Sequence, residues 1–160
     1  MTVDFLSFKK DWLNREKHFA AFTSGPLLDF WQQRQELSFE GVDGVPIEYV
    51  RFTSDDHHRA IVVVTGRTEG YLKYQELAYD LFRCGYDVWI LDHRGQGFSG
   101  RLLEDSHRGH VENFDDYVDD FEIFWLNIFM AEEYQQSFML AHSMGGAIAT
   151  LFLARHPNAV

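Results

Sequence analysis

Three short apolar runs of strand length stand out along the chain: residues 60–64, 87–91 and 138–141. The first two carry β-branched valine and isoleucine, and runs of this kind predict strands that are covered on both faces of a sheet. Residues 37–39 and 46–52 instead alternate between apolar and polar positions, on either side of a glycine-containing turn. This alternation predicts a β-hairpin at the start of the sheet.

The segments between and after these runs carry apolar residues at helical spacing. This spacing covers residues 71–84, which Gly85 ends, residues 113–130, and residues 144–155, which Pro157 follows. Strands that alternate with helices predict βαβ units. We therefore predict an α/β fold, with a mostly parallel sheet, an antiparallel hairpin at its start and helices on both faces.

The first 34 residues have a different pattern, and we divide the chain into a helical segment, residues 1–34, and an α/β portion, residues 35–160. Aromatic residues recur at helical spacing and predict an amphipathic helix over residues 4–22: Phe5, Phe8, Trp12, Phe19 and Phe22. With Lys9 and Lys10 beside it, this stripe could rest on a bilayer surface. The alternative is that it packs on the core of the domain.

Composition and charge narrow the classes of function. The chain has 160 residues, about one domain, and its 46% hydrophobic content excludes a wholly disordered protein. A formal net charge of −11 would repel a polyanion, which argues against nucleic acid as a partner. Cys84 is the single cysteine, so no disulfide can form within the chain. No apolar run of about 18 residues predicts a membrane-spanning helix.

The strongest candidate for chemistry is Ala141-His142-Ser143-Met144-Gly145, between the third apolar run and the last predicted helix. It matches the nucleophile elbow G-x-S-x-G with alanine in the first position. Such a turn displays a serine hydroxyl to a base and a carbonyl, and the small residues Ala141 and Gly145 let strand and helix approach closely. We predict Ser143 as the nucleophile and the backbone N–H of Met144 as an oxyanion donor. The alternative is a serine that only caps a helix.

A second oxyanion donor is expected in the turn Thr65-Gly66-Arg67, directly after the first apolar run. Folds with a nucleophile elbow place their other oxyanion N–H in this loop, so the backbone N–H of Arg67 is the candidate. The Arg67 side chain is either a contact for an anionic head group or an ordinary surface arginine.

Two further patterns do not point to a cofactor. Residues 95–100 contain G-x-G-x-x-G after a predicted strand, but no helix is predicted to begin there and no acid ends a strand about 20 residues later. We interpret this segment as a glycine-rich turn beneath the active site. The pairs His57–His58 and His107–His110 would have to converge with further ligands to bind a metal ion, and no cysteine cluster or H-E-x-x-H helix accompanies them. We therefore expect neither a metal ion nor a cofactor.

Together these segments resemble the α/β-hydrolase superfamily, in the branch of monoglyceride lipases and bacterial lysophospholipases, in particular those associated with the inner membrane. The resemblance extends over the whole chain. It rests on the elbow, on residues 65–67, 92–97 and 108–111, and on the Tyr-Val-Asp-Asp stretch at 117–120. It implies that Ser143 is the nucleophile and that Met144 and Arg67 supply the oxyanion N–H groups.

The chain departs from the superfamily in its catalytic acid and base. The triad order there is Ser, then Asp or Glu, then His, whereas the 17 residues after Ser143 contain no acid. His156 is the one histidine among them, roughly 20 Å away along the predicted helix. We expect the acid, the base and the substrate-selecting cap to follow Val160. The chain would then be the N-terminal portion of a longer enzyme and inactive by itself.

The resemblance implies a lysophospholipase, which forms an acyl-enzyme on Ser143 and releases a fatty acid, in the cytoplasm or peripherally on the inner membrane. Another carboxylic-ester hydrolase of the same fold is the first alternative, for example a monoacylglycerol lipase, a thioesterase or an aminopeptidase. The second is a non-catalytic protein that uses the hydrolase scaffold for binding.

Overall fold

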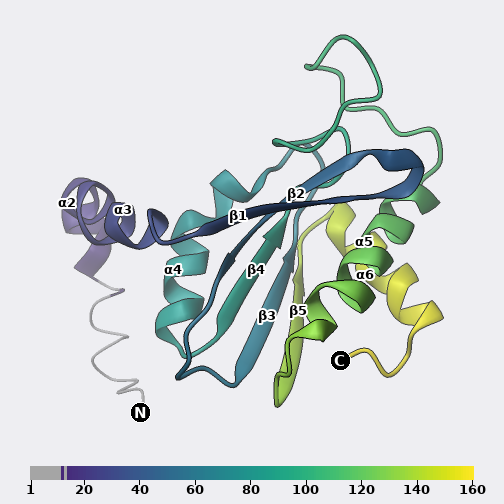
Figure 1. Cartoon of the computed structure of the whole chain (residues 1–160). Helices are drawn as coiled ribbons and strands as arrows, with labels where there is room; N and C mark the ends of the chain where they lie inside the picture. Colours follow the sequence, from purple (N-terminus) through teal and green to yellow (C-terminus); the bar gives the residue numbers. More distant parts are fainter. Residues whose placement is uncertain (1–11, 13) are drawn as a thin grey trace.

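The computed structural model describes Trp12 and residues 14–160, so Phe5, Phe8, Lys9 and Lys10 of the predicted stripe lie outside the described residues (Figure 1). The strands are β1 (Gln35–Glu40), β2 (Pro46–Phe52), β3 (Arg59–Val64), β4 (Asp87–Leu91) and β5 (Gln136–Ala141). The α-helices are α2 (Phe19–Ser24), α3 (Pro26–Trp31), α4 (Gln75–Arg83), α5 (Asp115–Asn127) and α6 (Met144–Arg155). Short 3-10 turns are η1 (Glu16–His18), η2 (Val42–Gly44), η3 (Tyr71–Tyr74) and η4 (Phe129–Ala131).

The strands form one sheet in the order β1-β2-β4-β3-β5. β1 and β2 make an antiparallel hairpin, β2 also runs antiparallel to β4, and β3 lies parallel to both β4 and β5. The parallel part follows from the connections, because a helix between two strands returns the chain to the end where the next strand must start. The predicted α/β sheet with an initial antiparallel hairpin is confirmed.

Two apolar cores lie on opposite faces of this sheet, because successive strand residues point to opposite sides. On one face, α5 and α6 cover a set of strand residues that includes Val62, Val64, Trp89 and Leu91. On the other face, α3 and α4 cover a set that includes Ile61, Val63, Val88 and Ile90. β3 and β4 are therefore covered on both faces, as predicted. β5 differs: none of its residues is buried, because it forms the edge of the sheet.

The helices deviate from the predicted bounds mainly at their ends. The predicted helix at 71–84 begins as the 3-10 turn η3 before α4, and Gly85 ends it with a φ of +84°. The predicted helix at 113–130 is shorter, since α5 ends at Asn127 and η4 follows it. The last helix, α6, has the predicted bounds.

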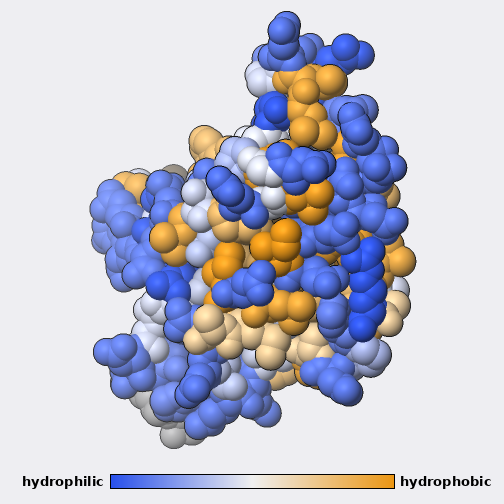
Figure 2. Space-filling view, turned by 45° about the vertical axis from the view of Figure 1, so that its right-hand side comes forward, coloured by the Kyte–Doolittle hydropathy of each residue, from blue (hydrophilic) through white to orange (hydrophobic). Residues whose placement is uncertain are grey.

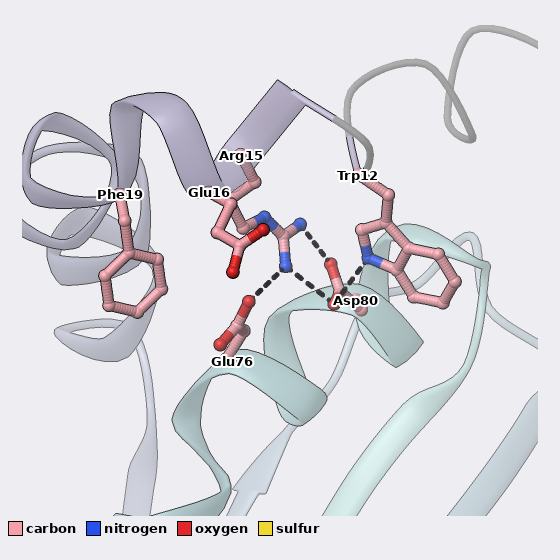
Figure 3. A pocket seen from close by; sticks show the side chains of 6 residues that line it. All are labelled: Trp12, Arg15, Glu16, Phe19, Glu76 and Asp80. Atoms are coloured by element: carbon pink, nitrogen blue, oxygen red, sulfur yellow. Dashed lines mark hydrogen bonds and ion pairs between the residues drawn. The ribbon is translucent and has the colours of Figure 1, made fainter.

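The described part of the N-terminal segment packs against α4. It is not one continuous helix, since the 3-10 turn η1 precedes α2. Arg15, which interrupts the aromatic stripe, donates to both carboxylate oxygens of Asp80 at 2.5 and 2.8 Å and to Glu76 at 2.8 Å (Figure 3). Its guanidinium also lies 4.3 Å from the centre of the Phe22 ring. A charged residue thus ties this segment to the domain.

Candidate active site

The elbow holds Ser143 in a strained backbone conformation at the end of β5 and the start of α6. Its φ of 52° and ψ of −120° lie in a region that residues other than glycine rarely adopt. Such a conformation costs on the order of 1–3 kcal/mol and persists only where the surroundings impose it. Ser143 is exposed, and its hydroxyl has no hydrogen-bond partner among the described residues. The geometry is that of a displayed serine at the carboxyl ends of the parallel strands.

Gly145 explains why the elbow needs a residue without a side chain. A Cβ at this position would lie 2.2 Å from the carbonyl oxygen of Val64 and 2.6 Å from that of Thr65. The N–H of His142 donates to the same Val64 oxygen at 3.1 Å. The first turn of α6 is therefore pressed against the end of β3. Ala141 ends β5, pairs with Val64 in the register, and is exposed.

Met144 provides the first N–H of α6. The next two N–H groups, those of Gly145 and Gly146, donate at 2.9 Å to the carbonyls of His142 and Ser143. No preceding helical turn supplies an acceptor for the Met144 N–H, and the positive end of the helix dipole lies at this point. Its position is suited to an oxyanion donor.

The loop after β3 lies next to the elbow. A Cβ on Gly66 would lie 3.0 Å from Nδ1 of His142, so the two segments are in contact there. The next residues form a tight turn in which Thr68 has a φ of +60°. The Arg67 side chain is exposed and donates to the carbonyl of Gly109 at 3.2 Å. The structure thus brings the predicted Arg67 turn and the Ser143 elbow together.

Glu69 joins this loop to the elbow, a role that the sequence analysis missed. Its buried carboxylate accepts from the Gly66 N–H at 2.7 Å, from Lys73 and Tyr74, and lies 3.1 Å from Nδ1 of His142. Burial raises the pKa of Glu69, but these hydrogen bonds outweigh it and hold the pKa at about 2. Only the i,i+4 spacing of Glu69 and Lys73 signals part of this network in the sequence.

The glycine-rich segment at 92–100 begins no helix and instead packs against the loop that follows β3. Buried Asp92 accepts from the N–H groups of Tyr71 and Phe98 at 2.6 and 2.8 Å. His93 Nε2 lies 3.1 Å from the carbonyl oxygen of Thr65. Burial raises the pKa of Asp92 to about 6 and lowers that of His93 to about 4. The segment is a turn, as interpreted, and it contacts the residue before the Gly66-Arg67 turn.

Gln96 and Arg94 complete the contacts of the same segment. The Gln96 amide bonds the backbone of residues 66, 68 and 69, and Arg94 forms a buried bidentate ion pair with Asp120 of α5 at 2.6 and 2.7 Å. Neither role could be assigned from the sequence, where both residues are part of an unremarkable polar turn.

The two histidines of the elbow and of the helix that follows it contact carboxylates, and neither is hydrogen-bonded to the Ser143 hydroxyl. His142 faces Glu69, and His156 lies at the far end of α6 with Nε2 3.2 Å from a carboxylate oxygen of Glu122. Within residue 12 and residues 14–160, no three His, Cys, Asp or Glu side chains converge as ligands for a metal ion.

Comparisons with known proteins agree with this geometry. Lysophospholipase L2 of Escherichia coli K12 is 58% identical over 150 residues, which is 94% of this chain and 44% of that protein. Probable lysophospholipase L2 of Haemophilus influenzae is 36% identical over 146 residues, which is 90% of this chain and 46% of that protein. The chain therefore spans somewhat less than half the length of these curated relatives.

The fold and the family model lead to the same assignment. The crystal structure of a thermostable carboxyl esterase from Bacillus coagulans in complex with glycerol superimposes with a TM-score of 0.67 and 26% identity, over 79% of this chain and 42% of that one. The family model described as serine aminopeptidase, S33, matches residues 55–160. The chain belongs to this serine hydrolase family and has the α/β-hydrolase fold.

Proposed function

We propose that the intact protein, including any sequence after Val160, is a serine hydrolase that cleaves the fatty-acyl ester of lysophospholipids. Ser143 Oγ attacks the ester carbonyl, the C–O bond to the glycerol oxygen breaks, and the fatty acid is held as an acyl-enzyme. Water then adds to the acyl carbon and releases the free acid, restoring the serine. The histidine and the acid that this sequence needs would follow Val160.

One observation carries the reaction type: the strained, exposed Ser143 at a strand-to-helix turn closed by Gly145. A helix-capping serine would need neither the positive φ nor the close approach of α6 to β3. The N–H groups of Met144 and Arg67 would bind the developing oxyanion, where one donor is typically worth a factor of about 10²–10³ in kcat. The substrate class rests on the relatives named as lysophospholipases.

The nucleophile is tested on the intact protein with a fluorophosphonate probe, which labels activated serines covalently. We expect labelling of the parent protein and none of Ser143→Ala, with esterase turnover lower by about 10⁶-fold. Ser137→Ala, in the strand β5 that leads to the elbow, is the matched control and should keep both. Equal labelling of the Ser143→Ala variant would exclude the mechanism.

The substrate class is tested separately with a panel under identical conditions. It contains a lysophosphatidylcholine, a lysophosphatidylethanolamine, a monoacylglycerol, an acyl thioester and an aminoacyl nitroanilide. We expect the highest kcat/KM for the lysophospholipids. A preference for monoacylglycerol, thioester or amide would keep the nucleophile but replace the proposed substrate with one of the alternatives on the same fold.

We also propose that the protein is cytoplasmic and works peripherally at the inner membrane, where its lipid substrate would be found. Trp12 and Phe19 are about half exposed on the N-terminal segment, beside the Arg15 contact with α4 (Figure 3). Among the described residues, no helix has the length and apolarity to cross a bilayer. We expect co-sedimentation with zwitterionic phosphatidylcholine liposomes that weakens in Trp12→Ala/Phe19→Ala, whereas Leu28→Ala, a control on α3, should bind normally.

A further inference from the structure

We propose that Gln96 is a positioning residue that sets the direction of the Arg67 N–H, the second oxyanion donor. The inference rests on the proposed function, because it assigns the orientation of a group in that active site. Gln96 lies in the segment between β4 and α5, far along the chain from the oxyanion loop, and its side chain is buried.

Both polar atoms of the Gln96 amide bond to one short stretch of backbone. Nε2 donates to the carbonyl of Gly66 at 2.9 Å and to that of Glu69 at 3.3 Å, and Oε1 accepts from the N–H of Thr68 at 2.9 Å. Rotating the amide by 180° would place its oxygen next to two carbonyl oxygens and its NH₂ group next to an N–H. Only the observed orientation therefore satisfies the contacts.

These contacts fix the two peptide groups that flank Arg67. The Gly66 carbonyl and the Arg67 N–H belong to one planar trans peptide, in which C=O and N–H point in opposite directions. A Gly66 oxygen held by Gln96 therefore points the Arg67 N–H away from Gln96. The next peptide contains the Thr68 N–H, which Gln96 also holds. Neither peptide can flip without breaking a hydrogen bond to Gln96.

Gln96 is itself held in place, which a positioning residue requires. Its N–H donates to the carbonyl of His93 at 3.0 Å, and Arg101 Nη1 donates to its carbonyl at 2.9 Å. Thr68, at a φ of +60°, is a strained residue that Gln96 contacts directly. The loop thus stores strain next to the donor, and the hydrogen bond from the Thr68 N–H to Gln96 opposes its release.

The test uses the intact protein with two near-isosteric variants. Gln96→Met removes both polar ends, and Gln96→Glu replaces the donor that holds Gly66 while keeping an acceptor for Thr68. We expect kcat to fall by up to about 10²-fold in both, the scale of one oxyanion donor, with KM unchanged. Gln33→Glu, an exposed glutamine after α3, is the matched control and should behave as the parent protein.

A second measurement separates positioning from general stability. A trifluoromethyl ketone forms a hemiketal on the serine whose oxyanion needs the donors, whereas the matching alkyl ether binds without an oxyanion. We expect the affinity of the variants for the ketone to fall by the same factor as kcat. Their affinity for the ether and their melting temperature should equal those of the parent protein. Parent-like kcat and ketone affinity would overturn the inference, as would parallel losses of ether affinity and melting temperature. Turnover by Ser143→Ala would instead contradict the proposed function.

Discussion

Gly145 is the residue with the least room in the elbow. An added Cβ would meet the carbonyl oxygens of Val64, the last residue of β3, and of Thr65, which follows it. These are backbone atoms, which cannot rotate away as a side-chain end could. α6 would have to withdraw from the sheet, and Ser143 would move with it. Gly146, the next residue in the same helix, has nothing within 4 Å of its would-be Cβ.

This contrast yields a matched pair of variants. Gly145→Ala should lower the free energy of unfolding by about 1–3 kcal/mol, because an extra carbon is forced into a packed contact. Gly146→Ala should leave it unchanged or raise it by up to about 1 kcal/mol, because alanine favours a helix over glycine. Urea unfolding of the intact protein measures both. Equal effects of the two substitutions would contradict the close approach.

His93 makes a prediction about pH. Burial lowers its pKa to about 4, although its bond to the Thr65 carbonyl favours the charged form. Between pH 6.5 and 4 the unfolded chain therefore binds a proton that the folded protein does not, and stability falls as pH falls. The free energy of unfolding lost over this pH range amounts to about 3 kcal/mol, from roughly 1.4 kcal/mol per pKa unit.

The measurement compares the parent protein with His93→Gln from pH 7 to pH 4. The parent should lose stability relative to the variant over this window. Asp92 acts in the opposite direction, because burial raises its pKa to about 6 and the folded state then gains a proton first as pH falls. Asp92 is present in both proteins, so its effect largely cancels in the difference. A constant difference would show that His93 titrates normally.

At the scale of elements, the segment 92–100 connects the sheet, the loop at residues 65–69 and α5. Arg94 and Asp120 are both buried and pair through two hydrogen bonds, and Asp120 also accepts from the N–H of Val42 in the turn before β2. One ion pair therefore holds three elements: the loop that carries Gln96, helix α5 and the hairpin turn.

Breaking this pair should be costly. Arg94→Met leaves the Asp120 carboxylate buried without its counter-charge, and we expect a loss of about 3–5 kcal/mol in the free energy of unfolding. Arg155→Met, which removes the solvent-exposed ion pairs of α6 with Asp115, Asp119 and Glu122 of α5, should cost about 0–1 kcal/mol. Chemical denaturation of both variants checks this. A small loss for Arg94→Met would mean that the loop is held by its backbone alone.

Elements with strong apolar periodicity could be predicted from the sequence, and the polar connections between them could not. β4 and α6 have the predicted bounds because the apolar run and the helical spacing that predict them lie within the sequence of each element. The partners of Arg15, Glu69 and Gln96 lie far away in the chain or depend on a turn geometry that no pattern encodes. Arg15 interrupts a stripe in the sequence and yet points at the domain, because Asp80 neutralises it there.

The same distinction applies within the candidate site. The elbow could be predicted because its small residues reflect a steric requirement. Strand and helix approach so closely at Gly145 that a side chain would not fit there. The support of the Arg67 loop could not, because a buried glutamine and an exposed one look the same in a sequence. Ser143 as the nucleophile, and the N–H groups of Met144 and Arg67 as oxyanion donors, stay predictions.

At the scale of the whole molecule, β5 is one of the two edge strands of the sheet, the other being β1. It pairs with β3 on one side only, and Phe138 in its middle is 40% exposed. Figure 2 shows apolar surface gathered in the middle of the face that its view brings forward. An unpaired strand with apolar side chains is a template for association with another chain.

We therefore predict that residues 1–160, expressed alone, self-associate and show essentially no esterase turnover. Association should fall in Phe138→Lys, which places a charge on the edge strand, and persist in Leu28→Lys, a substitution of similar exposure on α3. Analytical ultracentrifugation and the fluorophosphonate probe report the two properties. A monomer with a cooperative thermal transition would argue against the edge as the cause.

The pairing of β5 with β3 has a consequence for how the protein matures during synthesis. Residues of β3 leave the ribosome long before their partners in β5, for example Arg59 before Gln136. Contacts between distant parts of a chain form slowly, because a large loop must close first. Ser143 reaches its strained geometry only once β5 and α6 have docked on β3, so the nascent chain is expected to carry no competent nucleophile until that late step.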